Sequence, residues 1–265
     1  MLIKMVAGDV RPIGIFDSGV GGLSVLREVQ KLTPSENLIY FADTDYFPYG
    51  RRPLPEIRKR AFAITHRLLS SNVKLIVVAC NTASAAALED LRSVFDIPFI
   101  GIVPPIKPSV LASRTNRIVV LATSGTLVGD LYKDVVAENS ADTVISKVVS
   151  EELIDMIEQG DIQNLLLPQT VNNILKQDIS DGADTVVLGC THYEFISEVI
   201  KNEFPGIDVI GVSKAVARQT SVVLEKEKIQ KTDTSKGILN IITSSDHEGF
   251  MDAMHKLGFR RESYE

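Results

Sequence analysis

The chain has 265 residues, of which 45% are hydrophobic and 23% charged, an ordinary composition for a globular protein of one or two domains. Its formal net charge of −6 argues against binding to nucleic acid, and no apolar run approaches the length of a membrane span. Residues 1–12 contain no apolar core of signal-peptide length. We therefore expect a cytoplasmic protein whose two cysteines are free thiols.

Short apolar runs alternate with amphipathic, helix-length segments along almost the whole chain. This alternation predicts right-handed βαβ units, and therefore an α/β fold with mainly parallel sheets. The polar segment 225–236 is expected to be a loop or a frayed helix end. In chain order, the expected strands cover residues 13–16, 37–42, 75–79, 98–102, 118–122, 143–146, 185–189, 208–212 and 238–242.

Three prolines in VPPIKP, residues 103–108, interrupt both helix and strand and mark the clearest break in the chain. We expect two similar α/β domains with flavodoxin-like sheets, related by a pseudo-twofold axis and facing each other across a cleft. The first domain is predicted to comprise residues 1–103 plus 213–265, and the second residues 104–212. The active site is expected at their interface.

The segments VVACNTASAA (77–86) and VVLGCTHYEF (186–195) resemble each other, and they contain the only two cysteines of the chain. Each is an apolar run followed by a cysteine and a polar step that includes threonine. Each cysteine is also preceded by a strand that ends in a Ser-Gly turn and followed, at equal spacing, by a glycine in the next strand. Matching residue types as well as periods indicate an internal duplication. The matched pairs are Ser18 with Ser124, Cys80 with Cys190, and Gly101 with Gly211.

Both cysteines lie just beyond predicted strands, where open parallel sheets bind their ligands. Two facing halves would place Cys80 and Cys190 on opposite sides of one cleft. A thiol at a helix start has a lowered pKa, which suits an acid/base group near neutral pH. Two such groups can invert a stereocentre, because one removes a proton and the other returns one from the opposite face. The structural alternative is a pair of buried, inert cysteines.

Four segments strongly resemble the cofactor-independent glutamate racemases of the aspartate/glutamate racemase superfamily. They are DSGVGGLSVLREV (17–29), ADTDYFPYG (42–50), VACNTASA (78–85) and LGCTHYEF (188–195). The resemblance extends from about residue 12 to 222. It implies an isomerase that interconverts L- and D-glutamate without cofactor or metal and supplies D-glutamate for peptidoglycan. It also implies a homodimer.

The resemblance assigns proton transfer to the two cysteines, with Cys190 acting on the L-enantiomer and Cys80 on the D-enantiomer. Asp17 would attract the substrate ammonium group and polarise Cys80. His192 would assist Cys190, and Glu158 would support that half of the site. The other implied substrate-binding residues are Ser18, Asn81, Thr82, Thr123, Thr126 and Thr191, with Tyr49 and Gly50 as a cradle for the side-chain carboxylate.

Several of these residues also fit purely structural roles. Asp17 fits an Asx-type turn or helix cap, and the turn 48–50 fits an ordinary surface turn. His192 and Glu158 each fit a solvated helix position. The chain also departs from the family pattern at Pro104, Val149–Leu153 and Val212, but none of these departures removes a proton-transfer group.

Other functions fit parts of the sequence less well. IGIFDSGVGG resembles a dinucleotide-binding loop, but Ser24 stands where the third glycine is required. A cysteine hydrolase could use Cys190 with His192, but residues two apart rarely face each other and Cys80 is left unexplained. A zinc site made of Cys80, Cys190 and His192 would lack a closely spaced pair of ligands such as C-x-x-C. A two-lobed amino-acid binding protein would share the cleft but need no thiols.

Overall fold

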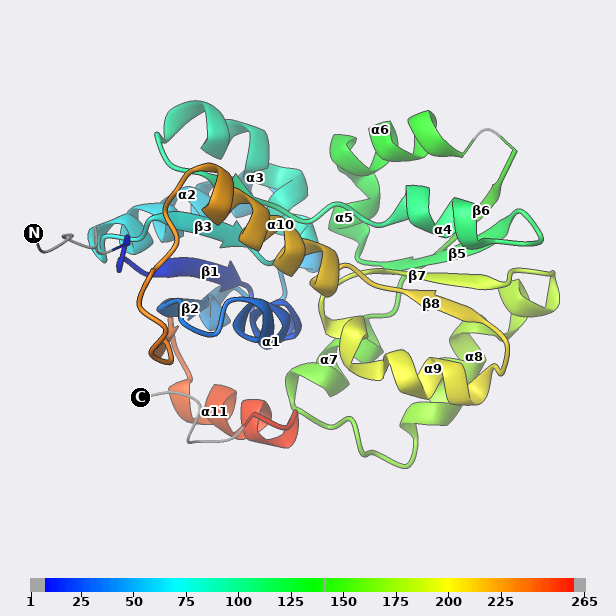
Figure 1. Cartoon of the computed structure of the whole chain (residues 1–265). Coiled ribbons are helices and arrows are strands. Elements are labelled where there is room, and N and C mark those ends of the chain that lie inside the picture. Colours follow the sequence, from blue (N-terminus) through cyan, green and yellow to red (C-terminus); the bar gives the residue numbers. More distant parts are fainter. Residues whose placement is uncertain (1–7, 141, 260–265) are drawn as a thin grey trace, which may run out of the picture.

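The computed structural model describes residues 8–140 and 142–259. The molecule has two lobes, each built on one sheet (Figure 1), and all strand pairings in both sheets are parallel. The first sheet consists of β1 (Ile13–Asp17), β2 (Leu38–Ala42), β3 (Leu75–Val78), β4 (Phe99–Ile100) and β9 (Leu239–Thr243). The second consists of β5 (Arg117–Ala122), β6 (Val144–Val148), β7 (Thr185–Gly189) and β8 (Asp208–Ile210).

Each strand expected from the sequence is present in the described residues, although β4 and β8 are shorter than predicted. Both shorten for the same reason, which is that the chain leaves the sheet to bond to a side chain. The N–H of Ile102 donates to Ser84 Oγ at 2.9 Å, and the N–H of Val212 donates to Glu194 Oε1 at 2.5 Å. These bonds replace further pairing with the neighbouring strand.

The two sheets share one topology. The first has the order β4-β3-β1-β2-β9 and the second the order β6-β5-β7-β8. Without β9, both follow the 2-1-3-4 order that begins the flavodoxin arrangement. The predicted fold class of two similar, mainly parallel α/β halves is therefore confirmed. The boundaries at 103/104 and 212/213 stay a prediction, and residues 1–7 and 260–265 of the predicted first domain lie outside the described residues.

The helices connect the strands and cover the sheets, as Figure 1 shows. Helix α10 (Ser213–Lys226) packs along α1 (Leu23–Leu32) and returns the chain to the first lobe. No helix in the described part of the chain is long and apolar enough to cross a membrane. The other helices are α2 (Leu54–Ser70), α3 (Asn81–Val94), α4 (Ile106–Ala112), α5 (Ser124–Val128), α6 (Asp130–Asn139), α7 (Glu151–Glu158), α8 (Leu167–Ser180), α9 (Ser197–Glu203) and α11 (His247–Lys256), with short 3₁₀ turns η1 (Thr44–Tyr46), η2 (Tyr49–Arg51) and η3 (His192–Ile196).

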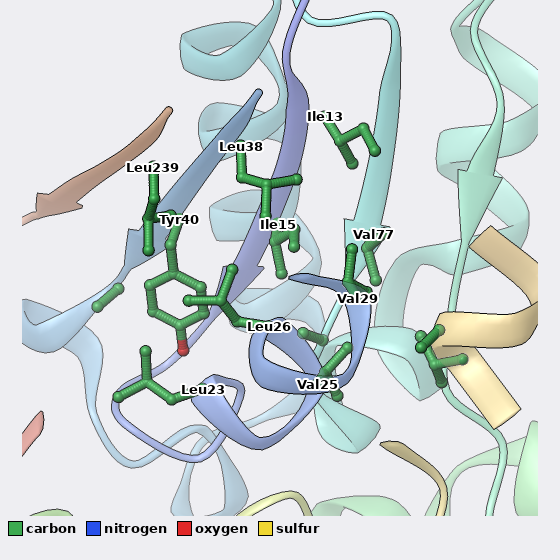
Figure 2. Packing of buried hydrophobic residues seen from close by; sticks show 14 of the residues in the cluster. Ile13, Ile15, Leu23, Val25, Leu26, Val29, Leu38, Tyr40, Val77 and Leu239 are labelled. Carbon is green, nitrogen blue, oxygen red and sulfur yellow. The ribbon is translucent and has the colours of Figure 1, made fainter. Parts of the chain in front are cut away.

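Strands β1, β2 and β3 of the first sheet are buried throughout, which explains why they are mainly apolar runs. Successive side chains of β1 point to opposite faces, so Ile13 and Ile15 join one cluster while Phe16 joins the other. Figure 2 shows the first of these clusters, in which Ile13 and Ile15 lie with residues of α1 and neighbouring strands. This packing fixes the strands, and therefore the positions of the residues that follow their carboxyl ends.

A buried ion pair lies at the opposite end of the first sheet. Lys74 Nζ is 2.6 Å from Glu36 Oε2, and it also donates to the carbonyl of Asp9 at 2.6 Å. The other oxygen of Glu36 accepts from the N–H of Lys231 at 2.8 Å. The pair therefore connects the start of β2 and β3 to the segment that follows α10.

Candidate active site

A cavity of about 20 Å³ lies where the carboxyl ends of the strands of the two sheets meet. This volume accommodates about one water molecule, so a larger ligand requires the lining residues to move apart. Both cysteines line it, one from each lobe, and neither is in a disulfide. The lining residues are Asp17, Ser18, Phe47, Pro48, Tyr49, Gly50, Cys80, Asn81, Thr82, Thr123, Ile154, Cys190, Thr191 and His192.

Cys80 follows β3 and occupies the N-cap position of α3. Burial raises the pKa of its thiol well above the ordinary value, and the neighbouring carboxylate of Asp17 raises it further. The expectation of a lowered pKa at this helix start is therefore wrong for Cys80, because burial and a nearby negative charge outweigh the helix. At neutral pH Cys80 retains its proton.

Cys190 directly follows β7 and precedes the short 3₁₀ turn η3. Its Sγ lies 3.6 Å from Nδ1 of His192. The expectation that residues two apart do not face each other is wrong here. The backbone turns at Thr191, with φ −60° and ψ −31°, and so brings the imidazole back to the sulfur.

His192 is held between Cys190 and Glu158, the last residue of α7. Its Nε2 lies 2.8 Å from Glu158 Oε2, and the same carboxylate accepts from the N–H of Val20 at 3.0 Å. Burial lowers the pKa of His192, but its bonds to Cys190 and Glu158 outweigh burial and raise it well above 6.5. The imidazole is therefore protonated at neutral pH and can donate a hydrogen bond to each neighbour.

Asp17 ends β1 and is fully buried beside Cys80. Its carboxylate accepts from the N–H of Ser18 at 2.7 Å, from the N–H of Gly22, and from Thr191 Oγ1 at 3.2 Å. Burial is the main cause that raises its pKa. Asp17 is not the cap of α1, because the N-cap is Gly22 and α1 has no side-chain cap bond. Asp17 lies in the cavity, where it joins the two lobes through Thr191.

Neutral polar groups complete the wall between the lobes. Thr82 Oγ1 of α3 lies 2.9 Å from Thr123 Oγ1, which in turn lies 2.9 Å from Thr126 Oγ1. Thr126 therefore contacts Thr123 but does not itself line the cavity. Asn81 is buried, and neither its amide oxygen nor its amide nitrogen has a hydrogen-bond partner in the part of the chain that the structure describes.

The turn 48–50 lines the cavity, as expected, but the Tyr49 hydroxyl donates to Asp43 Oδ2 at 2.6 Å. Phe47 and Ile154 also line the cavity and were not expected there. Phe47 lies within the motif 42–50, which is a signal that could have found it. Ile154 resembles any other apolar residue of an amphipathic helix, so the sequence contains no such signal.

The model for the Asp/Glu/hydantoin racemase family matches residues 13–220. The chain belongs to this family. It is 40% identical to the glutamate racemase of Roseiflexus sp. over 94% of this chain and 93% of that protein. The resemblance to glutamate racemases that the motifs indicate is thereby confirmed, as is the expected class of enzyme, an isomerase.

Solved structures of family members have the same fold. The glutamate racemase of Thermus thermophilus, in complex with β-chloro-D-alanine, matches with a TM-score of 0.84 and 31% identity over 97% of this chain and 96% of that chain. The glutamate racemase of Escherichia coli, in complex with L-glutamate and an activator, matches with a TM-score of 0.83 and 32% identity over 94% of this chain and 96% of that chain. The two-lobed architecture is thus that of the family.

Proposed function

We propose that this racemase interconverts L- and D-glutamate by proton transfer between the substrate α-carbon and two thiols, those of Cys80 and Cys190, without cofactor or metal. One observation carries the proposal. The two cysteines follow topologically equivalent strands, β3 and β7, of two sheets with the same order, and both line one cavity. A substrate between the two lobes would have one thiol on each face.

In the proposed reaction, one thiolate takes the α-proton and becomes a thiol, and the electron pair of the broken Cα–H bond is delocalised into the α-carboxylate. The opposite thiol then delivers its own proton to the other face of the α-carbon. Each turnover leaves the two cysteines with exchanged protonation states, and these are the states that the reverse reaction requires. With L-glutamate, Cys190 would act as the base and Cys80, whose raised pKa retains the proton, as the acid. Protonated His192 would assist Cys190 through its hydrogen bond.

The remaining polar groups would hold the substrate in place. Asp17 can accept from the substrate ammonium group, whose positive charge would favour the ionised carboxylate. Asn81 offers both a donor and an acceptor, and a ligand that satisfied them would remove the cost of a buried, unpaired amide. The other proposed contacts are made by Ser18, Thr82, Thr123 and Thr191, with the turn at Tyr49 and Gly50 for the side-chain carboxylate.

The proposal also includes a cellular role, which is the supply of D-glutamate for peptidoglycan by a cytoplasmic homodimer. This role rests on the family resemblance. The two free thiols are in keeping with a reducing compartment.

Serine substitutions at the two cysteines test the mechanism. We expect Cys80→Ser and Cys190→Ser each to lower racemisation of glutamate by at least about 10²-fold, because a hydroxyl is a far poorer base than a thiolate. Elimination of chloride from β-chloroalanine needs only the base that removes the α-proton. Cys80→Ser should therefore still process the L-analogue, and Cys190→Ser the D-analogue.

Racemisation is measured by circular dichroism, elimination by release of pyruvate, and folding by thermal unfolding. Exchange of the α-proton in heavy water, tested with each enantiomer of glutamate, measures the proton-transfer step directly. The two-thiol assignment is wrong if a folded variant retains full racemisation, or if both variants lose elimination of both enantiomers equally.

A further inference from the structure

We infer that Asp43 and Arg60 are positioning residues that hold the turn 48–50 in the shape that receives the substrate's distal carboxylate. The inference rests on the proposed function, because it concerns how that substrate's side chain is bound. Neither residue lines the cavity. Both act on it through Tyr49, which does.

Asp43 bonds to both Arg60 and Tyr49. It follows β2, is fully buried, and its N–H donates to the carbonyl of Asp17 at 2.9 Å, which fixes it beside a cavity residue. Its Oδ2 accepts from the Tyr49 hydroxyl at 2.6 Å and from Arg60 Nε at 3.0 Å. Its Oδ1 accepts from Arg60 Nη2 at 2.5 Å. The carboxylate and guanidinium thus form a bidentate, charge-assisted pair, which sets geometry as well as energy.

Arg60 projects from α2 and also holds the segment that leads into the turn. Its guanidinium lies over the ring of Tyr46, 3.9 Å from the ring centroid. Arg52 lies over the same ring at 4.9 Å and donates from Nε to the Tyr46 carbonyl at 2.8 Å. The ring is therefore held by two guanidinium groups just before the turn begins. Contacts of this kind are stronger for Arg than for Lys.

The bonds among Asp43, Arg60 and Tyr49 determine which groups of the turn are available to a ligand. The single hydroxyl proton of Tyr49 is donated to Asp43, and burial together with the charge of Asp43 raises the pKa of Tyr49, so this proton is retained. A carboxylate bound at this turn would therefore meet groups other than the Tyr49 hydroxyl proton. Arg60 balances the charge of Asp43, so no uncompensated negative charge lies behind this cradle.

The test compares substrates with and without a distal carboxylate. We expect Arg60→Met to raise KM for both enantiomers of glutamate about tenfold, with kcat changed less than about twofold, because binding is lost equally in the ground and transition states. The kcat/KM for elimination from β-chloroalanine, which has no distal carboxylate, should stay within about twofold of the wild type. Arg60→Lys, which keeps the charge but not the bidentate fork, should raise KM by an intermediate amount.

Arg58→Met is the matched control. Arg58 lies on the same helix, with its Nε 2.5 Å from Asp90 Oδ2 and its guanidinium over the ring of Phe62, and both of these partners lie outside the turn. Tyr49→Phe provides a second test that keeps the buried Asp43–Arg60 pair intact, and it too should raise KM for glutamate selectively. If Arg60→Met does not fold, Tyr49→Phe alone tests the inference.

Equal changes for glutamate and β-chloroalanine would overturn the inference, since they indicate a general loss of structure. So would an unchanged KM for glutamate in folded Arg60→Met and Tyr49→Phe. Failure of the wild-type protein to racemise glutamate would overturn the proposed function and this inference with it. Racemisation by the wild type without selective KM effects would overturn the inference alone.

Discussion

His192 lies between a carboxylate and a thiol, and these two neighbours set its charge. The bond to Glu158 is the one that can be removed without touching either sulfur. A histidine with a raised pKa is protonated in both the folded and unfolded states below 6.5, so its stabilising contribution is fully present there. That contribution is lost as the pH rises through the raised pKa of the folded state.

We predict that Glu158→Gln shifts the alkaline limb of the pH profile of kcat/KM to lower pH. The amide can still bond to His192, but it provides no negative charge to hold the imidazolium. The loss of activity should therefore be larger at pH 9 than at pH 7. The profile is measured by racemisation of L-glutamate across that range.

Glu152→Gln is the matched control for this prediction, because Glu152 lies on the same helix with its side chain exposed. It should leave the profile unchanged. If Glu158→Gln lowers activity by the same factor at every pH, Glu158 acts only as a structural support.

Helices α3 and α5 approach each other closely where the two lobes meet. A Cβ built on Gly125 of α5 would lie 2.8 Å from Cγ2 of Thr82 on α3. Thr82 cannot rotate this methyl away without losing the bond between its hydroxyl and Thr123. Gly125 is therefore required here by the distance between the lobes, and not by its own backbone conformation.

We predict that Gly125→Ala destabilises the protein by about 1–3 kcal/mol, although alanine ordinarily stabilises a helix relative to glycine by about 0.5–1 kcal/mol. Thr82→Ser removes the methyl group but keeps the hydroxyl. The double variant should therefore recover most of the lost stability and activity. Urea unfolding and glutamate racemisation measure the two effects. A double variant no more stable than Gly125→Ala would show that this contact is not the cause.

At the scale of elements, the sequence predicts those features that depend on local pattern. Alternating apolar runs locate the strands, and the residues that follow strand ends, such as Cys80 and Cys190, must lie at one edge of their sheets. What depends on packing between distant segments could not be predicted. Burial of Cys80 beside Asp17 reverses the expected direction of its pKa shift, and only the folded turn shows that the Tyr49 hydroxyl is directed to Asp43.

At the scale of the whole molecule, a buried charge pair lies at the end of the first sheet opposite to the cavity. Lys74 and Glu36 are both buried, and each makes a further bond to the backbone of another segment. Removing one partner of such a pair leaves a buried charge without compensation, whereas replacing both with apolar residues is much less costly.

We predict that Glu36→Gln lowers the free energy of unfolding by about 3–5 kcal/mol, and that Glu36→Leu with Lys74→Met loses clearly less. Urea unfolding gives both values. The exposed pair of Glu198 with Lys201 provides the control, since Glu198→Gln should change stability by less than about 1 kcal/mol. A double variant as unstable as Glu36→Gln would show that the backbone bonds, and not the pairing of charges, are what matters.

The return of the chain to the first lobe has a consequence for biosynthesis. The second sheet is made of strands that leave the ribosome one after another, whereas the first sheet receives its edge strand β9 only after the entire second lobe has been translated. Until then the edge of β2 is open and the face of α1 that α10 covers is exposed. We therefore expect the first lobe to be the part of the nascent chain that is bound by chaperones, although its first residues are synthesised earliest.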